Sequence, residues 1–287
     1  MKECTLIAEV GCNHMGDMNI ARDFIRVAHD FCGIRHIKFQ KRHNRELLSE
    51  EQYNAPHPVP ENSYGDTYGA HREFLEFSLD EHAELKELCD SLDLVYSTSV
   101  WDITSYREIA TLKPAYLKIP SATNTHTELL ELMCEDFPGE IHVSLGMTTR
   151  AEEAAIIDLF RRTGRIGDLV LYACTSGYPV PPQDTCLLEI PRLATAYGAD
   201  VKAIGYSGHH NGIALDTTAY VLGAAFIERH FTLDRTWKGT DHAASLEPDG
   251  LRRLQRNLYF TAQAMREKPE EILPIEVPQR EKLKWRR

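Results

Sequence analysis

The sequence predicts an α/β fold, a closed (β/α)8 TIM barrel, on three observations. Eight short apolar runs rich in β-branched residues recur along the chain, longer amphipathic segments separate them, and no hairpin signal joins any two of them. Eight strands that are each followed by a helix suit a closed parallel barrel better than an open doubly wound sheet. The strands are expected at residues 6–10, 36–40, 94–98, 115–119, 141–145, 169–173, 203–207 and 225–229.

Amphipathic segments between the strands predict the helices. In one of them, apolar residues recur every three or four positions from Leu85 onward. Asp80 is expected to cap that helix, and residues 149–152 have the sequence of a capping box for another. His82 falls in helical sequence and is expected at the solvated surface.

The chain is expected to form one catalytic barrel over residues 1–267 and a C-terminal extension over residues 268–287. Three prolines and a basic end, KLKWRR, indicate that the extension is an extended or docking arm. Residues 41–77 are rich in Pro, Asn, His and Tyr and are too many for an ordinary strand-to-helix connection. This stretch is therefore expected to be a loop with a role over the mouth of a pocket.

Composition predicts a soluble, cytoplasmic protein that acts on small molecules. Hydrophobic residues make up 43% of the chain, and seven cysteines without a CxxC pair indicate buried free thiols in a reducing compartment. No apolar stretch is long enough to span a membrane, and the first residues enter a strand too soon for a signal peptide. A formal net charge of −11 argues against nucleic acid or an anionic membrane as partner.

Polar side chains gather where the predicted strands end, which is where barrels of this kind place their chemistry. They are Asn13 and His14 after the first strand, together with Glu9, Lys38, Gln40, Thr98, Lys118, Ser121, Ser144, Ser176, Tyr178, Ser207, His209, Glu228, His230 and Asp241. Lys38 and Lys118 each interrupt an apolar strand and would be costly to bury without an anion. Outward-facing lysines among the helices are the alternative, but the serines at the same rim favour a site for a carboxylate or phosphate.

His209 and His230 close two strands that are neighbours in the predicted barrel, so their imidazoles can converge on one divalent ion. Two histidines leave open positions for water and a substrate oxygen, which suits a Lewis acid better than a structural zinc site. A pair of hydrogen-bonded core histidines is the alternative, and spacing alone does not separate the two interpretations.

Two carboxylates complete the set of candidates. Glu9 lies inside the first predicted strand, where an ionised carboxylate needs a cation or a reacting hydroxyl, so it is the first candidate for the acid/base. A salt bridge between Glu9 and Lys38 is compatible with the same placement. Asp241 either binds sugar hydroxyl groups or orders its own loop, and its position does not decide between them.

Motifs along essentially the whole chain resemble those of the sialic acid synthases. They are IAEVGCNHMGD, IKFQK, TYGAHREFLEFS, LKIPSATN, VSLGM, ACTSGYPVPP, IGYSGHHNGIALD, IERHFTLDRTWKGTDHAASLEP and LPIEVPQREKL. The resemblance is closest to the animal branch, which makes the 9-phosphate. It implies a C–C bond-forming transferase that condenses phosphoenolpyruvate with N-acetylmannosamine or its 6-phosphate, releasing phosphate by C–O cleavage.

The resemblance also implies roles for the candidate residues. Those that match the phosphoenolpyruvate site of the family are Lys38, Thr98, Lys118, Ser121, Ser144 and Ser207. His209 and His230 match the pair that holds a divalent ion, by expectation Mn²⁺, with Mg²⁺ or Co²⁺ as alternatives. Glu9 matches the acid/base, contacts to the acceptor sugar are implied for Gln40, Tyr178 and Asp241, and Ser176 is expected among the substrate-binding residues. A homodimer is expected from the family.

The sequence departs from the family pattern mainly on the sugar side. The antifreeze-like domain that usually follows the REKL segment is expected to be absent, and with it the arginine that it delivers to the partner's sugar pocket. Thr123 replaces an acidic residue, His210 stands where the animal branch has Glu, and Ser176 replaces an asparagine common in bacterial members. Candidate replacements for the missing cation are Arg42, His43, Arg45, His71 and Arg72.

Three alternatives remain open from the sequence. One is a synthase for another nonulosonic acid of the KDN, legionaminic or pseudaminic type. Another is a two-histidine metal hydrolase on the same barrel, which would need a further metal ligand at a strand end. The third is a non-catalytic paralogue that partners a full-length synthase.

Overall fold

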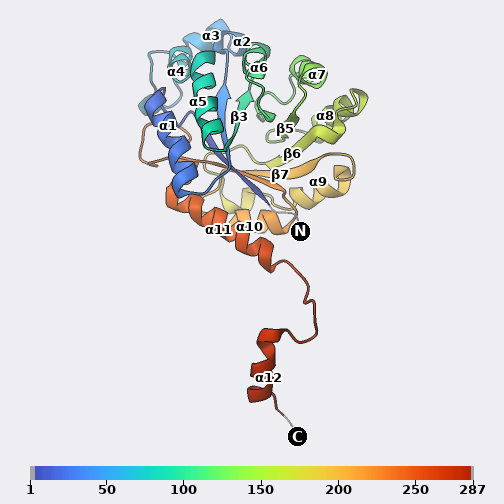
Figure 1. The fold of residues 1–287 in the computed structure, drawn as a ribbon. Coiled ribbons are helices and arrows are strands. Elements are labelled where there is room, and N and C mark those ends of the chain that lie inside the picture. The colour runs from blue at the N-terminus through green and yellow to red at the C-terminus, as the bar shows by residue number, and fades with distance from the viewer. Residues whose placement is uncertain (1–3, 286–287) are drawn as a thin grey trace.

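Eight parallel strands form a closed barrel in the order β1 to β8, as the sequence predicted (Figure 1). The computed structural model describes residues 4–285. The strands are β1 (Thr5–Gly11), β2 (His36–Lys41), β3 (Val95–Val100), β4 (Tyr116–Ile119), β5 (Glu140–Ser144), β6 (Leu169–Cys174), β7 (Ala203–Gly208) and β8 (Phe226–His230). Each of the eight predicted strands overlaps the observed one, because short β-branched runs between helices identify buried parallel strands.

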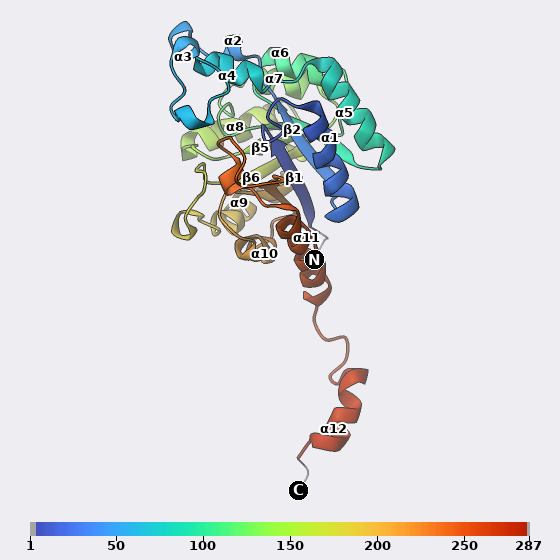
Figure 2. The same ribbon diagram turned by 90° about the vertical axis from the view of Figure 1, so that its left-hand side faces the viewer.

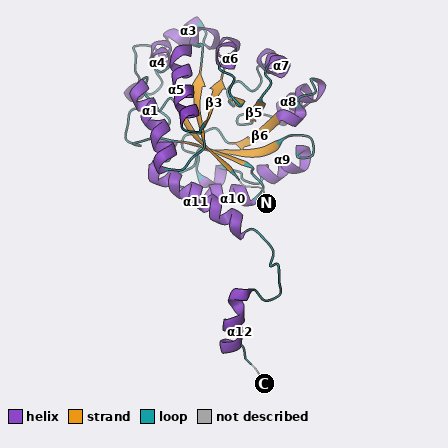
Figure 3. Ribbon diagram, viewed as in Figure 1, coloured by secondary structure: helices purple, strands orange, loops and turns teal. Residues whose placement is uncertain are grey.

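Helices follow the strands and surround the barrel (Figure 3). The longer ones are α1 (Met18–Arg26), α5 (Leu79–Ser91), α6 (Ile103–Ala110), α7 (Thr127–Asp136), α8 (Arg150–Arg162), α9 (Glu189–Tyr197), α10 (Ala214–Val221) and α11 (Pro248–Ala264). Short turns are η1 (Val27–Phe31), η3 (Ile166–Asp168), η4 (Pro182–Asp184) and η5 (His242–Ala244). In the described part of the chain no helix combines the length and the apolar character that crossing a bilayer requires.

Helix α5 begins two residues earlier than the sequence suggested. Ser78, not Asp80, is its N-cap, and the Ser78 side chain and Glu81 form a capping box. Asp80 lies inside the first turn, where its negative charge interacts favourably with the positive end of the helix dipole. The capping box predicted for α8 is confirmed, with Thr149 and Glu152 as its members.

His82 of α5 is buried, which corrects the expectation of a solvated side chain. Its Nδ1 atom lies 2.8 Å from the hydroxyl oxygen of Tyr96, and its ring packs edge-on against Phe39 and Phe77. Burial lowers the pKa of His82 to about 3, so the ring is neutral. Four of the seven cysteines are buried free thiols as expected, whereas Cys186 is exposed and two others line the cavity described below.

Residues 41–77 are not a plain loop but carry four short helical segments. They are α2 (Asn44–Leu47), α3 (Glu50–Asn54), η2 (Pro60–Asn62) and α4 (Tyr68–Phe74). α2 and α3 lie at one end of the molecule, and the C-terminal tail lies at the opposite end, in both Figure 1 and Figure 2. The expected role over the pocket mouth fits this placement, because the segment follows the carboxyl end of β2.

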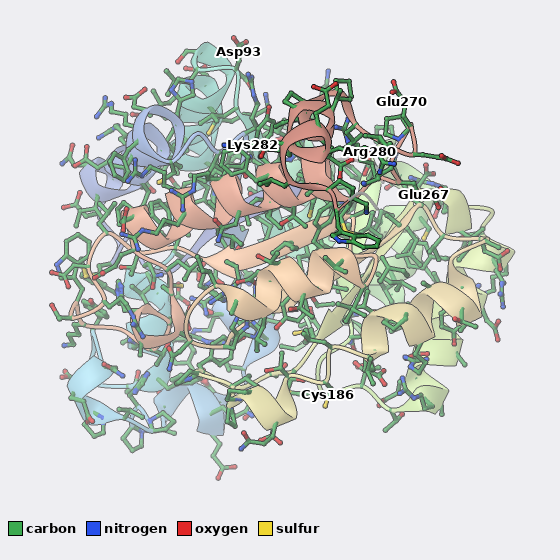
Figure 4. The ribbon with its side chains drawn as sticks, turned by 90° about the horizontal axis from the view of Figure 1, so that it is seen from below. Asp93, Cys186, Glu267, Glu270, Arg280 and Lys282 are labelled. Carbon is green, nitrogen blue, oxygen red and sulfur yellow. The ribbon has the colours of Figure 1, made fainter. Side chains whose placement is uncertain are left out.

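The C-terminal tail leaves the barrel after α11, and α12 lies away from it (Figure 1). It contains the turn η6 (Pro274–Glu276) and the helix α12 (Val277–Leu283), so the expected extended arm is partly helical. Figure 4 shows the tail from below, with Arg280 and Lys282 on α12. Ile275 and Leu283 are exposed along it.

The barrel interior has an apolar bottom and a polar upper half. Ile7, Tyr116, Val170 and Tyr172 form a separate apolar cluster inside the barrel. Side chains alternate along each strand, so positions two residues further along point to the same interior. Glu9 therefore lies above Ile7, and it pairs in register with Lys38 of β2 and His230 of β8.

A buried ion pair outside the barrel wall holds the ends of β7 and β8 in place. Arg229 of β8 forms a salt bridge with Asp216 of α10, and both side chains are fully buried. Arg229 also donates hydrogen bonds to the carbonyl oxygens of His210 at 2.6 Å and Gly212 at 2.9 Å. The pair thus fixes the loop that begins at His209, one of the predicted metal ligands.

Replacing Asp216 with Ala should destabilise the protein strongly, because it leaves the Arg229 guanidinium buried without its carboxylate. We expect the free energy of unfolding to fall by about 3–5 kcal/mol, measured by urea denaturation. Asp249→Ala is the matched control, since Asp249 pairs with Arg252 and Arg253 on the exposed face of α11. Equal unfolding midpoints for the two variants would contradict the structural role of the Arg229 pair.

Candidate active site

A cavity of about 460 Å³ opens at the carboxyl ends of the strands. Thirteen of the sixteen strand-end candidates from the sequence, all but Asn13, His14 and Thr98, line it: Glu9, Lys38, Gln40, Lys118, Ser121, Ser144, Ser176, Tyr178, Ser207, His209, Glu228, His230 and Asp241. These residues come from seven of the eight strands or the loops after them, so only closure of the barrel brings them together.

The floor of the cavity is a chain of alternating charges. Lys38 forms a salt bridge with Glu9, Lys118 forms one with Glu228, and the Lys38 Nζ atom lies 3.7 Å from Glu228 Oε2, which links the two pairs. All four side chains are at least 95% buried. The lysines therefore point into the barrel and not outward among the helices.

Hydroxyl groups extend this chain. The Lys38 ammonium group donates to Ser99 Oγ at 2.6 Å, and Ser207 Oγ donates to Glu228 Oε1 at 3.1 Å. Ser144 Oγ is buried without a hydrogen-bond partner among the described residues. An unpaired buried hydroxyl beside two ammonium groups is a group that an anionic ligand can satisfy.

The pKa values of the two carboxylates of the floor are shifted in opposite directions. Burial raises the pKa of Glu9, and the attraction of Lys38 opposes this shift without cancelling it. Burial also acts to raise the pKa of Glu228, but Lys118 and Lys38 outweigh it and hold that pKa below its usual range. Glu9 is therefore suited to exchange a proton near neutral pH, whereas Glu228 stays ionised as a counter-charge. Burial lowers the pKa of Lys118.

His209 and His230 lie side by side at the rim, with ring centroids 5.4 Å apart. His209 Nδ1 lies 3.0 Å from the carbonyl oxygen of Thr175, so Nδ1 carries the proton and Nε2 is the nitrogen that can bind a ligand. Burial acts to lower the pKa of His209, but a hydrogen bond with the Cys174 side chain outweighs it and raises that pKa. His230 Nδ1 is buried and has no hydrogen-bond partner in residues 4–285. Burial lowers the pKa of His230 to about 4, which keeps the ring in the neutral form that metals require.

Gly11 leaves open space where three of these groups converge. It has a φ of +54°, at an irregularity in the pairing of β1 with β2. A Cβ atom at this position would lie 3.4 Å from Glu9 Oε1, 3.5 Å from His230 Cε1 and 3.6 Å from Asp241 Oδ2. Within residues 4–285 no set of three or more His, Cys, Asp or Glu side chains is already arranged around a common metal position. The donors present are thus two imidazoles with carboxylates nearby and open space between them.

Two candidates for sugar contacts, Tyr178 and Gln40, line the same cavity as Ser121, a candidate for the phosphoenolpyruvate site. Tyr178 packs against both rings, with centroids 4.4 Å from His209 and 5.8 Å from His230. Gln40 donates a hydrogen bond to the Cys12 sulfur, and both side chains line the cavity. Ser121 Oγ accepts from the backbone N–H of Gly146 at 3.0 Å.

Among the candidates with an implied role, Thr98 is the one that the structure places elsewhere. β3 continues to Val100, two residues beyond the predicted end, and its inward positions are occupied by Ser97 and Ser99. Thr98 points to the helix layer, where its hydroxyl donates to the Tyr96 hydroxyl at 2.7 Å. Ser99, which contacts Lys38, is the residue that sequence reasoning missed, and strict alternation along a longer strand would have found it.

Glu228 was recognised at a strand end but received no role from the sequence. Its signal was an acidic residue inside an apolar strand, the same signal that identified Glu9. Of the five candidate replacement cations, Arg42, His71 and Arg72 line the cavity, whereas His43 and Arg45 do not. His210 is buried behind the barrel wall, with its Nδ1 atom 3.0 Å from the Tyr206 hydroxyl, and is not part of the cavity.

Known proteins with similar sequences include N-acetylneuraminate-9-phosphate synthases and N,N'-diacetyllegionaminic acid synthases. The chain is 34% identical to the N-acetylneuraminate-9-phosphate synthase of Homo sapiens over 285 residues, covering 98% of this chain and 76% of that relative. It is 32% identical to the N,N'-diacetyllegionaminic acid synthase of Campylobacter jejuni over 266 residues, covering 92% and 78%.

Solved structures of known proteins are also similar to this chain. The crystal structure of an N-acetylneuraminic acid synthetase from Leptospira borgpetersenii in complex with citrate matches with a TM-score of 0.81 at 27% identity, over 98% of this chain and 93% of that one. A truncated 3-deoxy-D-arabino-heptulosonate 7-phosphate synthase from Thermotoga maritima matches with a TM-score of 0.66 at 14% identity, over 91% and 87%, and shares the fold alone. The family model that describes the NeuB family matches residues 24–270, and with these relatives it shows that the chain belongs to the NeuB family.

Proposed function

We propose that this protein is a sialic acid synthase that joins phosphoenolpyruvate to the aldehyde carbon of an N-acetylmannosamine-type sugar. The observation that carries the proposal is that one cavity contains both buried lysines, Lys38 and Lys118, and both rim histidines, His209 and His230. Lysines at the floor suit a doubly charged enol ester, and imidazoles at the rim suit a cation that faces the aldehyde. The synthases named above support the same reaction.

The lysines would hold the phosphate and carboxylate of phosphoenolpyruvate, with Ser144, Ser207 and Ser121 as further donors. In the free protein the two ammonium groups face two carboxylates, so the floor has little net charge. Because burial raises the pKa of Glu9, that carboxylate can take up a proton when the anion enters, leaving the floor net positive. Glu9 would thus couple substrate binding to proton uptake.

The bond changes then follow from this placement. C3 of the enol attacks the aldehyde carbon, and Glu9 would donate its proton to the aldehyde oxygen as that C–C bond forms. A water molecule adds at C2 and returns a proton to Glu9, and the bond between C2 and the phosphate oxygen breaks. Phosphate therefore leaves with the bridging oxygen, and the product is a nine-carbon 2-keto acid.

A divalent metal, Mn²⁺ by first choice with Mg²⁺ or Co²⁺ as alternatives, would be held by His209 and His230. Three observations support this assignment: Nδ1 of His209 is taken by a carbonyl oxygen, His230 Nδ1 has no partner among the described residues, and Gly11 places no Cβ atom between Glu9, His230 and Asp241. When bound, such an ion supplies a Lewis acid that polarises the aldehyde carbonyl. Tyr178 packs on both rings and would hold them in place.

The acceptor is proposed to be N-acetylmannosamine or its 6-phosphate, with a legionaminic acid precursor as the second candidate. The legionaminic acid precursor remains a candidate because the Campylobacter relative is 32% identical to this chain, close to the 34% of the human relative. Gln40, Ser176, Tyr178 and Asp241 line the cavity and are the proposed contacts to the acceptor. Measuring phosphate release with a panel of hexose acceptors would rank them.

We further propose that the protein acts as a homodimer in the cytoplasm. All seven cysteines are free, which suits a reducing compartment, and the dimer is an expectation from the family. Light scattering coupled to size exclusion would measure the oligomeric state directly.

Replacing Lys118 with Met should remove most of the turnover, because Lys118 supplies one of the two ammonium groups at the floor. We expect the rate of phosphate release at saturating substrates to fall by about 10²-fold or more. Lys202→Met is the matched control, since Lys202 pairs with Glu140 at the half-exposed amino end of β5. If Lys118→Met kept the wild-type rate, the proposed catalytic role would be wrong and a non-catalytic partner would be the better interpretation.

Removing divalent metal with EDTA should abolish phosphate release, and adding Mn²⁺ should restore it. His230→Ala is expected to weaken Mn²⁺ binding by about 100-fold or more, measured by the electron paramagnetic resonance signal of free Mn²⁺. His29→Ala, which alters a histidine paired with Asp30 outside the cavity, should bind Mn²⁺ as the wild type does. Unchanged binding in His230→Ala would place the metal elsewhere.

A further inference from the structure

The outer wall of the cavity contains two arginines that the proposed condensation does not use. Arg42 follows β2 and Arg72 lies on α4. Both are buried, with exposed fractions of 8% and 9%. Their guanidinium carbons each lie 5.6 Å from the centroid of the Trp101 ring, so the two cations flank one indole. Arg72 is also 5.0 Å from the Tyr68 ring.

The two arginines differ in how their charges are balanced. Arg42 forms a salt bridge with Glu76, with Nε 2.5 Å from Oε1, and the same carboxylate accepts from the Arg42 backbone N–H at 2.9 Å. For Arg72, no carboxylate of the described chain lies within salt-bridge distance. A buried guanidinium without a counter-charge is costly, and binding of an anion would remove that cost.

Unpaired donors point to the same conclusion. Arg72 Nε and Trp101 Nε1 are both buried without a hydrogen-bond partner in the described structure, and both side chains line the cavity. Both atoms can only donate, so the missing partner must be an acceptor. A ligand rich in acceptor oxygens fits such a set, and water or a neutral acyl group would leave the charge of Arg72 unbalanced.

His71 adds a further donor to this wall. The Tyr64 backbone N–H donates to His71 Nδ1 at 3.1 Å, which places the ring proton on Nε2. Burial, with the nearby His57 and the two arginines, lowers the pKa of His71 to about 4, so the ring is neutral. His71 thus offers an N–H group without adding a third positive charge.

We propose that Arg72, supported by Arg42 and Trp101, binds a phosphate group carried by the acceptor sugar. The inference rests on the proposed function and deepens it by naming a phosphorylated acceptor. Phosphoenolpyruvate brings its own phosphate and carboxylate to the two lysines of the strands, so a second anion site needs a second anionic substrate. The site lies on segments after β2 and β3, outside the strand interior that holds the lysines.

The test compares N-acetylmannosamine 6-phosphate with N-acetylmannosamine as acceptors. For the wild type, kcat/KM should favour the phosphorylated sugar, and in Arg72→Met the ratio of the two kcat/KM values should fall by about 30- to 100-fold. Arg72→Lys, which keeps the charge, should recover part of that ratio. Arg45→Met is the matched control, because Arg45 stacks on Tyr53 in the same segment but does not line the cavity. Its ratio should equal that of the wild type.

Calorimetric binding measurements separate this inference from the proposed function. Without any turnover, Arg72→Met should bind the sugar phosphate at least about tenfold more weakly than the wild type while binding phosphoenolpyruvate normally. Equal affinities for the sugar phosphate in both proteins would overturn the site even if the wild type forms sialic acid. Weaker binding of phosphoenolpyruvate as well would also overturn it, because the loss would not be specific to the acceptor. If the wild type binds the sugar phosphate through Arg72 but releases no phosphate, the proposed function alone fails.

Discussion

Two lysines and two carboxylates share one buried floor, and the rest of the site depends on how their charges balance. Neither Lys38 nor Lys118 would be stable in the barrel interior alone, and Glu9 and Glu228 supply the counter-charges. The two carboxylates are not equivalent, because burial raises the pKa of Glu9 while the lysines hold the pKa of Glu228 low. A floor of this kind can accept a new anion by protonating one carboxylate instead of displacing a lysine.

The barrel builds this floor through register. Parallel pairing brings Glu9 level with Lys38 on one side and with His230 on the other, so the proposed acid/base lies between the proposed anion site and the rim histidines. Outside the wall, the Arg229 pair fixes the chain just after β7, where His209 begins the next loop. Strand ends, rather than mobile loops, therefore position the groups proposed to react.

The segment between β2 and α5 contributes a second group of cavity residues, which come from short helices and loops instead of strands. The strands supply the lysines, carboxylates and histidines, whereas Arg72 comes from a short helix above the strand ends. Its burial without a carboxylate partner in the described chain contrasts with the paired floor below. Such a division lets the reaction site stay constant while the surrounding segments select the acceptor, as expected for a barrel.

The eight strands, the barrel and most of the cavity could be predicted from the amino-acid sequence, because the β/α period and polar residues at strand ends are local patterns. The sequence did not show where β3 ends. Because the predicted strand stopped two residues early, Thr98 was chosen as its last inward-facing residue in place of Ser99. Nor could the sequence show that His82 is buried or that Glu228 joins the two lysines. Those facts depend on contacts between residues far apart in the chain, which only the closed tertiary structure decides, since burial and charge pairing are set by neighbours in space.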